Sequence, residues 1–283
     1  MTIRTQQSPS SMGDTRLAAT LAAEAGARLM ALRARVDAGT ITDSADELRH
    51  AADASSQAYL ATELARERPG DAVLSEEDDD DLRRLLADRV WIIDPLDGSR
   101  EFAERTPDGS WRTDFAVHVA LWRRGRGLTD AAVALPGRGL LRTTATPSRP
   151  EQAPALDVLA GRRPLRIAVS RTRPAAIVDS LAERGDVEVV PMGSAGVKAI
   201  AVVEGTVDAY VHADGLHEWD SAAPVAVATT AGMVTTRLDG SGLVYNQADP
   251  WLPDLVICHP ALVACLRAML EAAGHRSGQG AHR

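Results

Sequence analysis

The feature that most constrains this chain is an apolar run followed at once by two acids, at residues 91–99 (WIIDPLDGS). The apolar residues predict a buried strand that delivers Asp94 to its end. Because proline cannot continue a ladder of hydrogen bonds, Pro95 predicts a turn, and Asp97 falls within it. Gly98 lets the backbone approach a ligand closely. Two carboxylates on one rigid turn suit a hard divalent cation, although Asp-Gly is also common in plain surface turns.

Two further acidic turns lie far away in the sequence. Glu76 follows a predicted short strand at 72–74, and Asp220 begins a predicted helix at 220–232. Asp220 has a simpler interpretation, because an acid at a helix start is often only an N-cap. The same alternative applies to Asp53, at the start of a predicted helix over 53–68. The three acidic turns predict a metal site only when they are taken together.

The order of predicted elements favours a layered α/β fold. Asp14 is a candidate N-cap for a long first helix, and paired helices precede a mainly antiparallel set of strands. Residues 144–163 lack a clear period and predict a linker, after which strands and helices alternate. We expect an N-terminal lobe, a C-terminal lobe and two flexible tails, at residues 14–160, 161–273, 1–13 and 274–283.

Charge and composition limit the classes of binding partner that we expect for this chain. The chain has 31 basic and 39 acidic residues, and the net charge of −8 disfavours binding to a nucleic acid polymer. No apolar run is long enough to span a membrane, and the polar N-terminus lacks the core of a signal peptide, so we expect a cytoplasmic protein. Among the basic residues only Lys198 is a lysine. It is either a chance survivor in an arginine-rich composition or a site that needs a slim ammonium.

The three acidic motifs together resemble those of the inositol monophosphatase superfamily of metal-dependent phosphatases. The motifs are the acid pair at 75–77 (SEE), the segment 94–99 (DPLDGS) and the segment 219–223 (WDSAA), and they occur in the family's order. The resemblance covers roughly residues 14–272 and implies a layered αβαβα sandwich of the inositol monophosphatase and fructose-1,6-bisphosphatase type.

The resemblance also implies roles for individual residues, carried over position by position. Two Mg²⁺ ions, and a third that Asp53 supports, would activate a water molecule that attacks the phosphate. The implied metal ligands are Glu76, Asp94, the carbonyl of Leu96, Asp97, Asp220 and Asp53. The implied catalytic residues are Glu76, Ser99 and Asp220. The candidate substrate contacts are Asp97, Gly98, Ser99, Ser194, Lys198 and Glu218.

Within the superfamily, the chain is most similar to the CysQ-type 3′-phosphoadenosine 5′-phosphate (PAP) phosphatases of actinobacteria. The segments 97–102 (DGSREF), 114–121 (DFAVHVAL) and 193–198 (GSAGVK) carry this similarity, although the last has the length found in inositol monophosphatases. The implied reaction removes the 3′-phosphate of PAP to give AMP, in the setting of sulfate assimilation. Inositol-1-phosphate, fructose-1,6-bisphosphate and histidinol phosphate are alternative substrates, and a non-catalytic binding protein is a remote alternative. Relatives are often homodimers, so a homodimer is one expected assembly.

Overall fold

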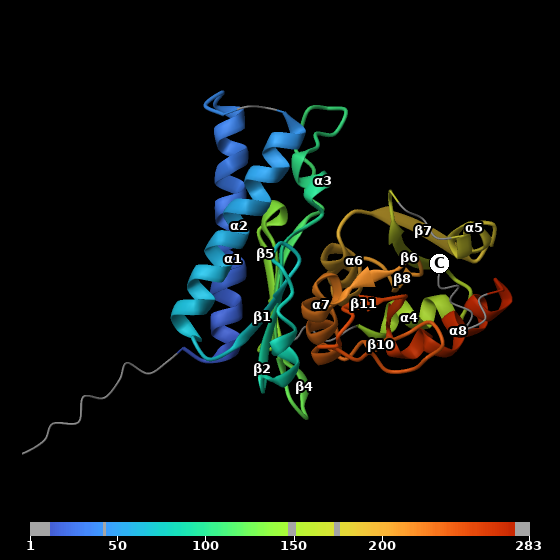
Figure 1. Cartoon of the computed structure of the whole chain (residues 1–283). Helices are drawn as coiled ribbons and strands as arrows, with labels where there is room; N and C mark the ends of the chain where they lie inside the picture. Colours follow the sequence, from blue (N-terminus) through green and yellow to red (C-terminus); the bar gives the residue numbers. More distant parts are fainter. Residues whose placement is uncertain (1–11, 42–43, 147–150, 173–175, 275–283) are drawn as a thin grey trace, which may run out of the picture.

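The computed structural model describes residues 12–41, 44–146, 151–172 and 176–274. These residues form five layers, in which helices alternate with two β-sheets (Figure 1). The layered αβαβα sandwich expected from the sequence is confirmed. In the part of the chain that the structure describes, no helix is long and apolar enough to cross a membrane.

The first two layers come from the N-terminal half. Helices α1 (Asp14–Asp37) and α2 (Ala45–Glu67) pack together on one face of a five-stranded sheet. Its strands lie in sequence order, with β1 parallel to β2 and the other neighbours antiparallel. The strands are β1 (Ala72–Ser75), β2 (Arg89–Asp97), β3 (Ala116–Arg123), β4 (Gly127–Leu135) and β5 (Leu140–Thr143), with a 3₁₀ turn η1 (Leu82–Leu86) and the short helix α3 (Ser99–Ala103) between them.

The C-terminal half supplies the other sheet and the remaining helices. The second sheet has the order β10-β12-β8-β6-β7, with a separate pair β11-β9. Its strands are β6 (Leu165–Ser170), β7 (Val187–Met192), β8 (Ala209–His212), β10 (Val234–Thr236) and β12 (Leu255–Cys258), and the small pair is β9 (Leu216–His217) with β11 (Trp251–Leu252). The helices are α4 (Gln152–Leu159), α5 (Ala176–Ala182), α6 (Ala195–Val203), α7 (Glu218–Thr230) and α8 (Val263–Ala272), joined by 3₁₀ turns η2 (Pro136–Arg138) and η3 (Pro260–Leu262).

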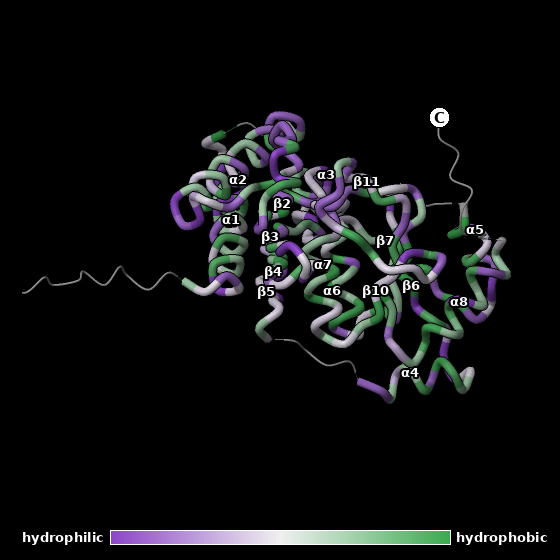
Figure 2. Tube along the Cα trace, turned by 60° about the horizontal axis from the view of Figure 1, so that its bottom comes forward, coloured by the Kyte–Doolittle hydropathy of each residue, from purple (hydrophilic) through white to green (hydrophobic). Residues whose placement is uncertain are grey.

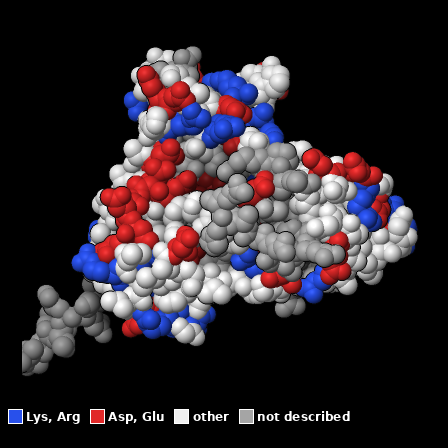
Figure 3. Space-filling view, turned by 45° about the vertical axis from the view of Figure 1, so that its right-hand side comes forward, with Lys and Arg blue, Asp and Glu red and all other residues white. Residues whose placement is uncertain are grey.

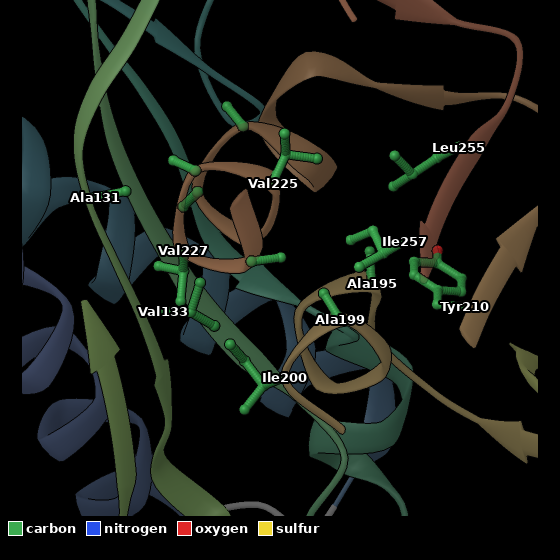
Figure 4. Packing of buried hydrophobic residues seen from close by; sticks show 14 of the residues in the cluster. Ala131, Val133, Ala195, Ala199, Ile200, Tyr210, Val225, Val227, Leu255 and Ile257 are labelled. Atoms are coloured by element: carbon green, nitrogen blue, oxygen red, sulfur yellow. The ribbon is translucent and has the colours of Figure 1, made fainter. Parts of the chain in front are cut away.

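Helices α6 and α7 form the central layer and explain how the two sheets are joined. All nine residues of α6 are buried, as expected for a helix that is apolar on every side. Figure 4 shows Ile200 and Val227 facing Val133 of β4, while Ala195 lies toward Tyr210 and Ile257 of the second sheet. Figure 2 shows this layer as mainly hydrophobic between the sheets. One hydrophobic core therefore crosses from the first half of the chain to the second.

Two predicted helix starts are wrong. The N-cap of α1 is Gly13, and Asp14 is the first residue of the helix. Helix α2 begins at Ala45, where the Ser44 side chain accepts a hydrogen bond from the backbone N–H of Glu47. Asp53 therefore lies in the middle of α2, and the N-cap interpretation of this residue is excluded.

Three other boundaries differ from those predicted. Strand β2 continues through Pro95 to Asp97, with its pairing to β3 interrupted between Asp94 and Asp97. The interruption accommodates the missing N–H of proline, and the Pro95 carbonyl accepts a hydrogen bond from Ser56 at 2.7 Å. The expected linker contains helix α4, whose Ala155 and Val158 are buried. Helix α7 begins two residues before Asp220. Most of the expected tails lie outside the described residues.

Candidate functional site

A pocket of about 410 Å³ lies where the ends of β1 and β2 meet the first turns of α6 and α7. Residues from all three acidic motifs line it, although more than 140 positions separate the first motif from the last in the sequence. The expected site residues that line this pocket are Glu76, Asp94, Leu96, Asp97, Gly98, Ser99, Ser194, Lys198 and Asp220.

Asp94 is fully buried at the base of this pocket. Its Oδ1 atom accepts a hydrogen bond from the backbone N–H of Leu96 at 3.0 Å. Its Oδ2 atom is buried and has no hydrogen-bond partner among the residues that the structure describes. Burial, together with repulsion by Glu76 and Asp97, raises the pKa of the Asp94 carboxyl well above its usual value. A buried acid with an unpartnered oxygen needs a cation beside it to be charged.

Asp97 is held from the opposite side by the start of α6. Its Oδ2 atom accepts hydrogen bonds from the Ser194 hydroxyl at 2.5 Å and from the backbone N–H of Gly196 at 2.8 Å. Both donors use the same carboxylate oxygen, and only 8% of Asp97 is exposed. These bonds fix the direction of the carboxylate relative to Asp94.

Glu76 and Asp220 complete the acidic wall from two other elements. Asp220 lies in the first turn of α7, where its carboxylate accepts a hydrogen bond from the backbone N–H of His217 at 2.5 Å. The N-cap interpretation of Asp220 is wrong, because His217 is the N-cap and Asp220 is the third residue of the helix, whose side chain bonds back to the N-cap backbone while the residue lines the pocket. The loss of water around the Glu76 carboxyl and repulsion by Asp220 raise the pKa of Glu76, although solvent still reaches this side chain.

The backbone turns sharply beside these acids. Gly98 has a φ of +88°, and a Cβ atom there would lie 3.2 Å from the Asp114 carbonyl and 3.3 Å from the Ser194 Cβ. Any other residue would be strained in this conformation and crowded by both neighbours. Helix α3 begins at the next residue, Ser99. Gly98 and Ser99 both line the pocket.

Ser194 and Lys198 form a compact pair on the other wall. Ser194 has a φ of +56°, which is unusual for a residue with a side chain. The Lys198 ammonium donates a hydrogen bond to the Ser194 carbonyl at 2.5 Å and lies over the ring of Tyr210. Burial lowers the pKa of Lys198 to about 8. The ammonium thus stabilises the strained residue that holds Asp97, while Lys198 still contributes to the lining of the pocket.

Two expected site residues are not brought to this pocket. Glu218 is fully buried and accepts hydrogen bonds from the backbone N–H groups of Asn246 and Gln247, at 2.6 and 2.7 Å. Glu218 therefore does not make the expected substrate contact, and it holds the loop at residues 246–247 instead. Asp53 does not line the pocket either, and burial together with the nearby Glu77 raises the pKa of Asp53 to about 6.

Three residues without an expected role lie at or beside the site. Arg49 and Arg100 line the pocket, and no ion pair involves Arg100 among the described residues. His118 is fully buried, with Nε2 at 3.3 Å from Asp97 Oδ2 and Nδ1 at 3.9 Å from Asp94 Oδ2. In the sequence, the only clue to a role for His118 is that it is a polar residue inside the apolar run 115–121. Its position opposite Asp94 depends on the register between β2 and β3, which only the sheet shows.

The donor set fits a hard divalent cation. Carboxylate oxygens are the ligands that Mg²⁺ prefers, and Asp94 offers a buried oxygen that has no protein partner in the described structure. Asp94 and Asp97 also present carboxylate oxygens within 4.8 Å of each other. The residues present are therefore compatible with a metal centre.

A layered sandwich with an acidic metal centre at the junction of its sheets defines a class of metal-dependent phosphatases. The chain belongs to the inositol monophosphatase family, whose sequence profile matches residues 13–271. The fold is that of Staphylococcal IMPase-II, with a TM-score of 0.70 at 19% identity over 91% of this chain and 93% of that one. The expected family and the expected class of enzyme, a phosphatase, are confirmed.

Two more relatives indicate the part of the family to which the chain is similar. A 3′-phosphoadenosine 5′-phosphate phosphatase of Mycobacterium bovis is 50% identical over 249 residues, which cover 86% of this chain and 88% of the relative. CysQ from Bacteroides thetaiotaomicron has a TM-score of 0.67 at 26% identity, over 86% of this chain and 96% of that one. The similarity to CysQ-type proteins expected from the sequence is confirmed.

Proposed function

We propose that this protein is a Mg²⁺-dependent phosphatase that removes the 3′-phosphate of PAP to give AMP and phosphate. The observation that carries the proposal is the buried, unpartnered Asp94 oxygen in a pocket lined by three further carboxylates of the acidic motifs. A phosphate dianion cannot enter such a pocket unless cations neutralise the acids. The choice of substrate is supported by the M. bovis relative, which is 50% identical and is named for this reaction.

Two Mg²⁺ ions are proposed, with a third, weaker one near Asp53. Bound Mg²⁺ supplies Lewis-acid chemistry, because it lowers the pKa of water and neutralises phosphate oxygens. The proposed ligands are Glu76, Asp94, the Leu96 carbonyl, Asp97 and Asp220, with Asp53 supporting the third ion.

The chain's own residues then orient the reactants. Glu76 and the Ser99 hydroxyl, from two residues that line the pocket, are assigned to orient the attacking water and accept its proton. The backbone N–H groups of Gly98 and Ser99 bind phosphate oxygens. Asp220 would orient a second water, which donates a proton to the 3′-oxygen as the phosphorus–oxygen bond breaks, and the proton that Glu76 accepted restores that water. The products are AMP and phosphate.

The second phosphate of PAP needs a cation of its own. Lys198 and Ser194 are the proposed contacts, with Asp97 and Gly98 at the reacting end. Lys198 retains donors besides the one that it gives to the Ser194 carbonyl, because an ammonium carries three. Arg100 is a further cation of the pocket lining.

A substrate panel tests the proposed function. Phosphate release from PAP, inositol-1-phosphate, fructose-1,6-bisphosphate and histidinol phosphate is measured with Mg²⁺ and with excess chelator. We expect the highest kcat/KM with PAP and no turnover in chelator. Preference for another compound of the panel would assign that substrate instead, and no release from any would indicate a non-catalytic binding protein.

Lys198→Ala provides a sharper test at one residue. A charge-assisted hydrogen bond contributes about 1.5–3 kcal/mol, so kcat/KM for PAP should fall roughly ten- to a hundredfold. Inositol-1-phosphate has no second phosphate, and its kcat/KM should change by about threefold or less. Lys198→Arg should restore only part of the loss, because the guanidinium is wider. The matched control is the exposed Arg126→Ala, which lies in the β3–β4 turn, away from the pocket.

An equal loss on both substrates would contradict the contact with the second phosphate. It would assign Lys198 to the support of Ser194 instead, through the hydrogen bond that the ammonium makes to its carbonyl. The cytoplasmic location, the setting in sulfate assimilation, the homodimer and the lobe boundary at residue 160 stay predictions.

A further inference from the structure

His118 lies where three elements of the site meet. On β3 it is the cross-strand partner of Asp94, so the sheet register places it beside the acids. It is fully buried, and its ring separates Asp97 from the first turn of α7. No role for this residue follows from the acidic motifs themselves.

The Nδ1 atom of His118 is 3.1 Å from the backbone carbonyl of Trp219, the residue before Asp220. A carbonyl only accepts hydrogen bonds, so Nδ1 carries the hydrogen and donates it. This bond ties β3, in the first half of the chain, to the turn of α7 that carries Asp220. The His118 side of this bond is fully buried, and losing the bond leaves the Trp219 carbonyl without this donor.

The other edge of the ring is packed against α6. A Cβ atom on Gly196 would lie 2.1 Å from His118 Nε2, so only glycine leaves room for the ring at this position. The backbone N–H of Gly196 donates to Asp97 at 2.8 Å. The same contact that brings α6 against His118 therefore also places a donor on Asp97. Gly196 occupies the space beside Nε2, which argues against His118 as a metal ligand.

We propose that His118 is a positioning residue for the metal centre, which holds Asp220 and Asp97 at a fixed separation through Trp219 and Gly196. The inference rests on the proposed role of these two acids as metal ligands. Without the ring, the first turn of α7 and the carboxylate end of β2 lose their shared buried contact. The ligands would then have to be ordered when the ion binds, and that ordering reduces the affinity.

Direct metal binding tests this proposal without relying on turnover. The dissociation constant of Mn²⁺ is measured on the full chain by the electron paramagnetic resonance signal of the free ion. His118→Ala should raise this constant roughly ten- to a hundredfold, as is typical when partners of metal ligands are removed. The KM for PAP at saturating metal should change by about threefold or less, because His118 does not line the pocket.

His118→Asn separates the hydrogen bond from the packing of the ring. The asparagine amide can occupy the place of Nδ1 and donate to the Trp219 carbonyl, so it should restore most of the Mn²⁺ affinity. The matched control is His259→Ala, a buried histidine at the end of the second sheet. It should lower the melting temperature without changing the Mn²⁺ affinity.

The outcomes distinguish the two proposals. If the wild-type protein binds no Mn²⁺, the proposed metal centre fails. If the wild type binds Mn²⁺ and a folded His118→Ala binds it equally well, only the positioning role is overturned. If His118→Ala does not fold, the measurement is made on His118→Asn. A folded His118→Asn that binds Mn²⁺ tenfold more weakly than the wild type would overturn the positioning role of the hydrogen bond to the Trp219 carbonyl.

Discussion

Several residues of this pocket are held in arrangements that lower the stability of the fold. Four carboxylates from three motifs line one pocket, and the pKa values of Asp94 and Glu76 are raised because burial and mutual repulsion oppose their charges. The Ser194 backbone adds strain at the same place. Such costs persist where function requires them, and a bound cation would offset the repulsion.

Asp94→Asn should separate stability from function. The amide removes a buried charge that its neighbours repel, so the melting temperature in chelator should be equal to or above that of the wild type. Turnover of PAP should fall by at least about a hundredfold, because the buried ligand oxygen is neutralised. Steady-state kinetics and thermal unfolding in chelator check the two parts. Retention of more than about a tenth of wild-type kcat would show that Asp94 is dispensable for the metal centre.

Among the secondary-structure elements, a cluster of arginines around Asp14 fixes the outer helices to the first sheet. The Asp14 carboxylate accepts hydrogen bonds from Arg68 at the end of α2 and from Arg89 on β2, and it also pairs with Arg123 on β3. Burial alone would raise the pKa of Asp14, but the bonds from Arg89 and Arg68 outweigh it and lower the pKa. One acid therefore joins the start of α1 to three other elements.

Asp14→Asn should lower the melting temperature at pH 7 by about 3–10 °C, because charge-assisted bonds contribute about 1.5–3 kcal/mol. A lowered pKa means that this stabilisation is present above the ordinary pKa of 3.8 and is lost as the pH falls through the lower folded value. The difference from wild type should therefore shrink below about pH 4. Asp157→Asn, which breaks an exposed pair with Arg162, is the matched control and should shift the melting temperature by about 1 °C or less.

For the whole molecule, the pocket lies at the junction of the two halves. Its acids come from the residue after β1, from β2 and from α7, and the α6–α7 layer that supports them packs against both sheets. Figure 3 shows acidic side chains gathered in a band on one face of the molecule, which agrees with the net charge of −8. A small anion accompanied by cations suits such a surface better than a polyanion does.

Metal removal should accordingly affect the stability of the whole chain. At about 100 times its dissociation constant, Mg²⁺ stabilises the folded state by about 2.7 kcal/mol, which corresponds to a rise of about 5–10 °C in melting temperature. Ca²⁺ should raise the melting temperature as well but should not support turnover, because it prefers longer bonds and more ligands. Thermal unfolding and phosphate release are measured with each ion and with chelator. Full turnover in excess chelator would contradict the proposed mechanism.

Much of the site was predictable from local sequence. The motif at 94–99 contains much of its own geometry, since Pro95 interrupts the strand pairing between Asp94 and Asp97, and Gly98 turns the backbone directly after Asp97. The alternation of strands and helices also indicated the layers. In contrast, the predicted start of the second helix at Asp53 was wrong, because the polar stretch before it gave no apolar period from which to place the N-cap at Ser44.

The sequence by itself determined the three acidic motifs, the elements that carry them and the class of chemistry that they suit. Only the tertiary structure decided which residues reach the pocket. It buried Glu218 against the loop at 246–247, and it turned Lys198 toward the Ser194 carbonyl. It also placed His118 between two motifs more than 100 positions apart. Local patterns specify the backbone of each turn, whereas the direction of a buried side chain depends on partners that packing brings from distant segments.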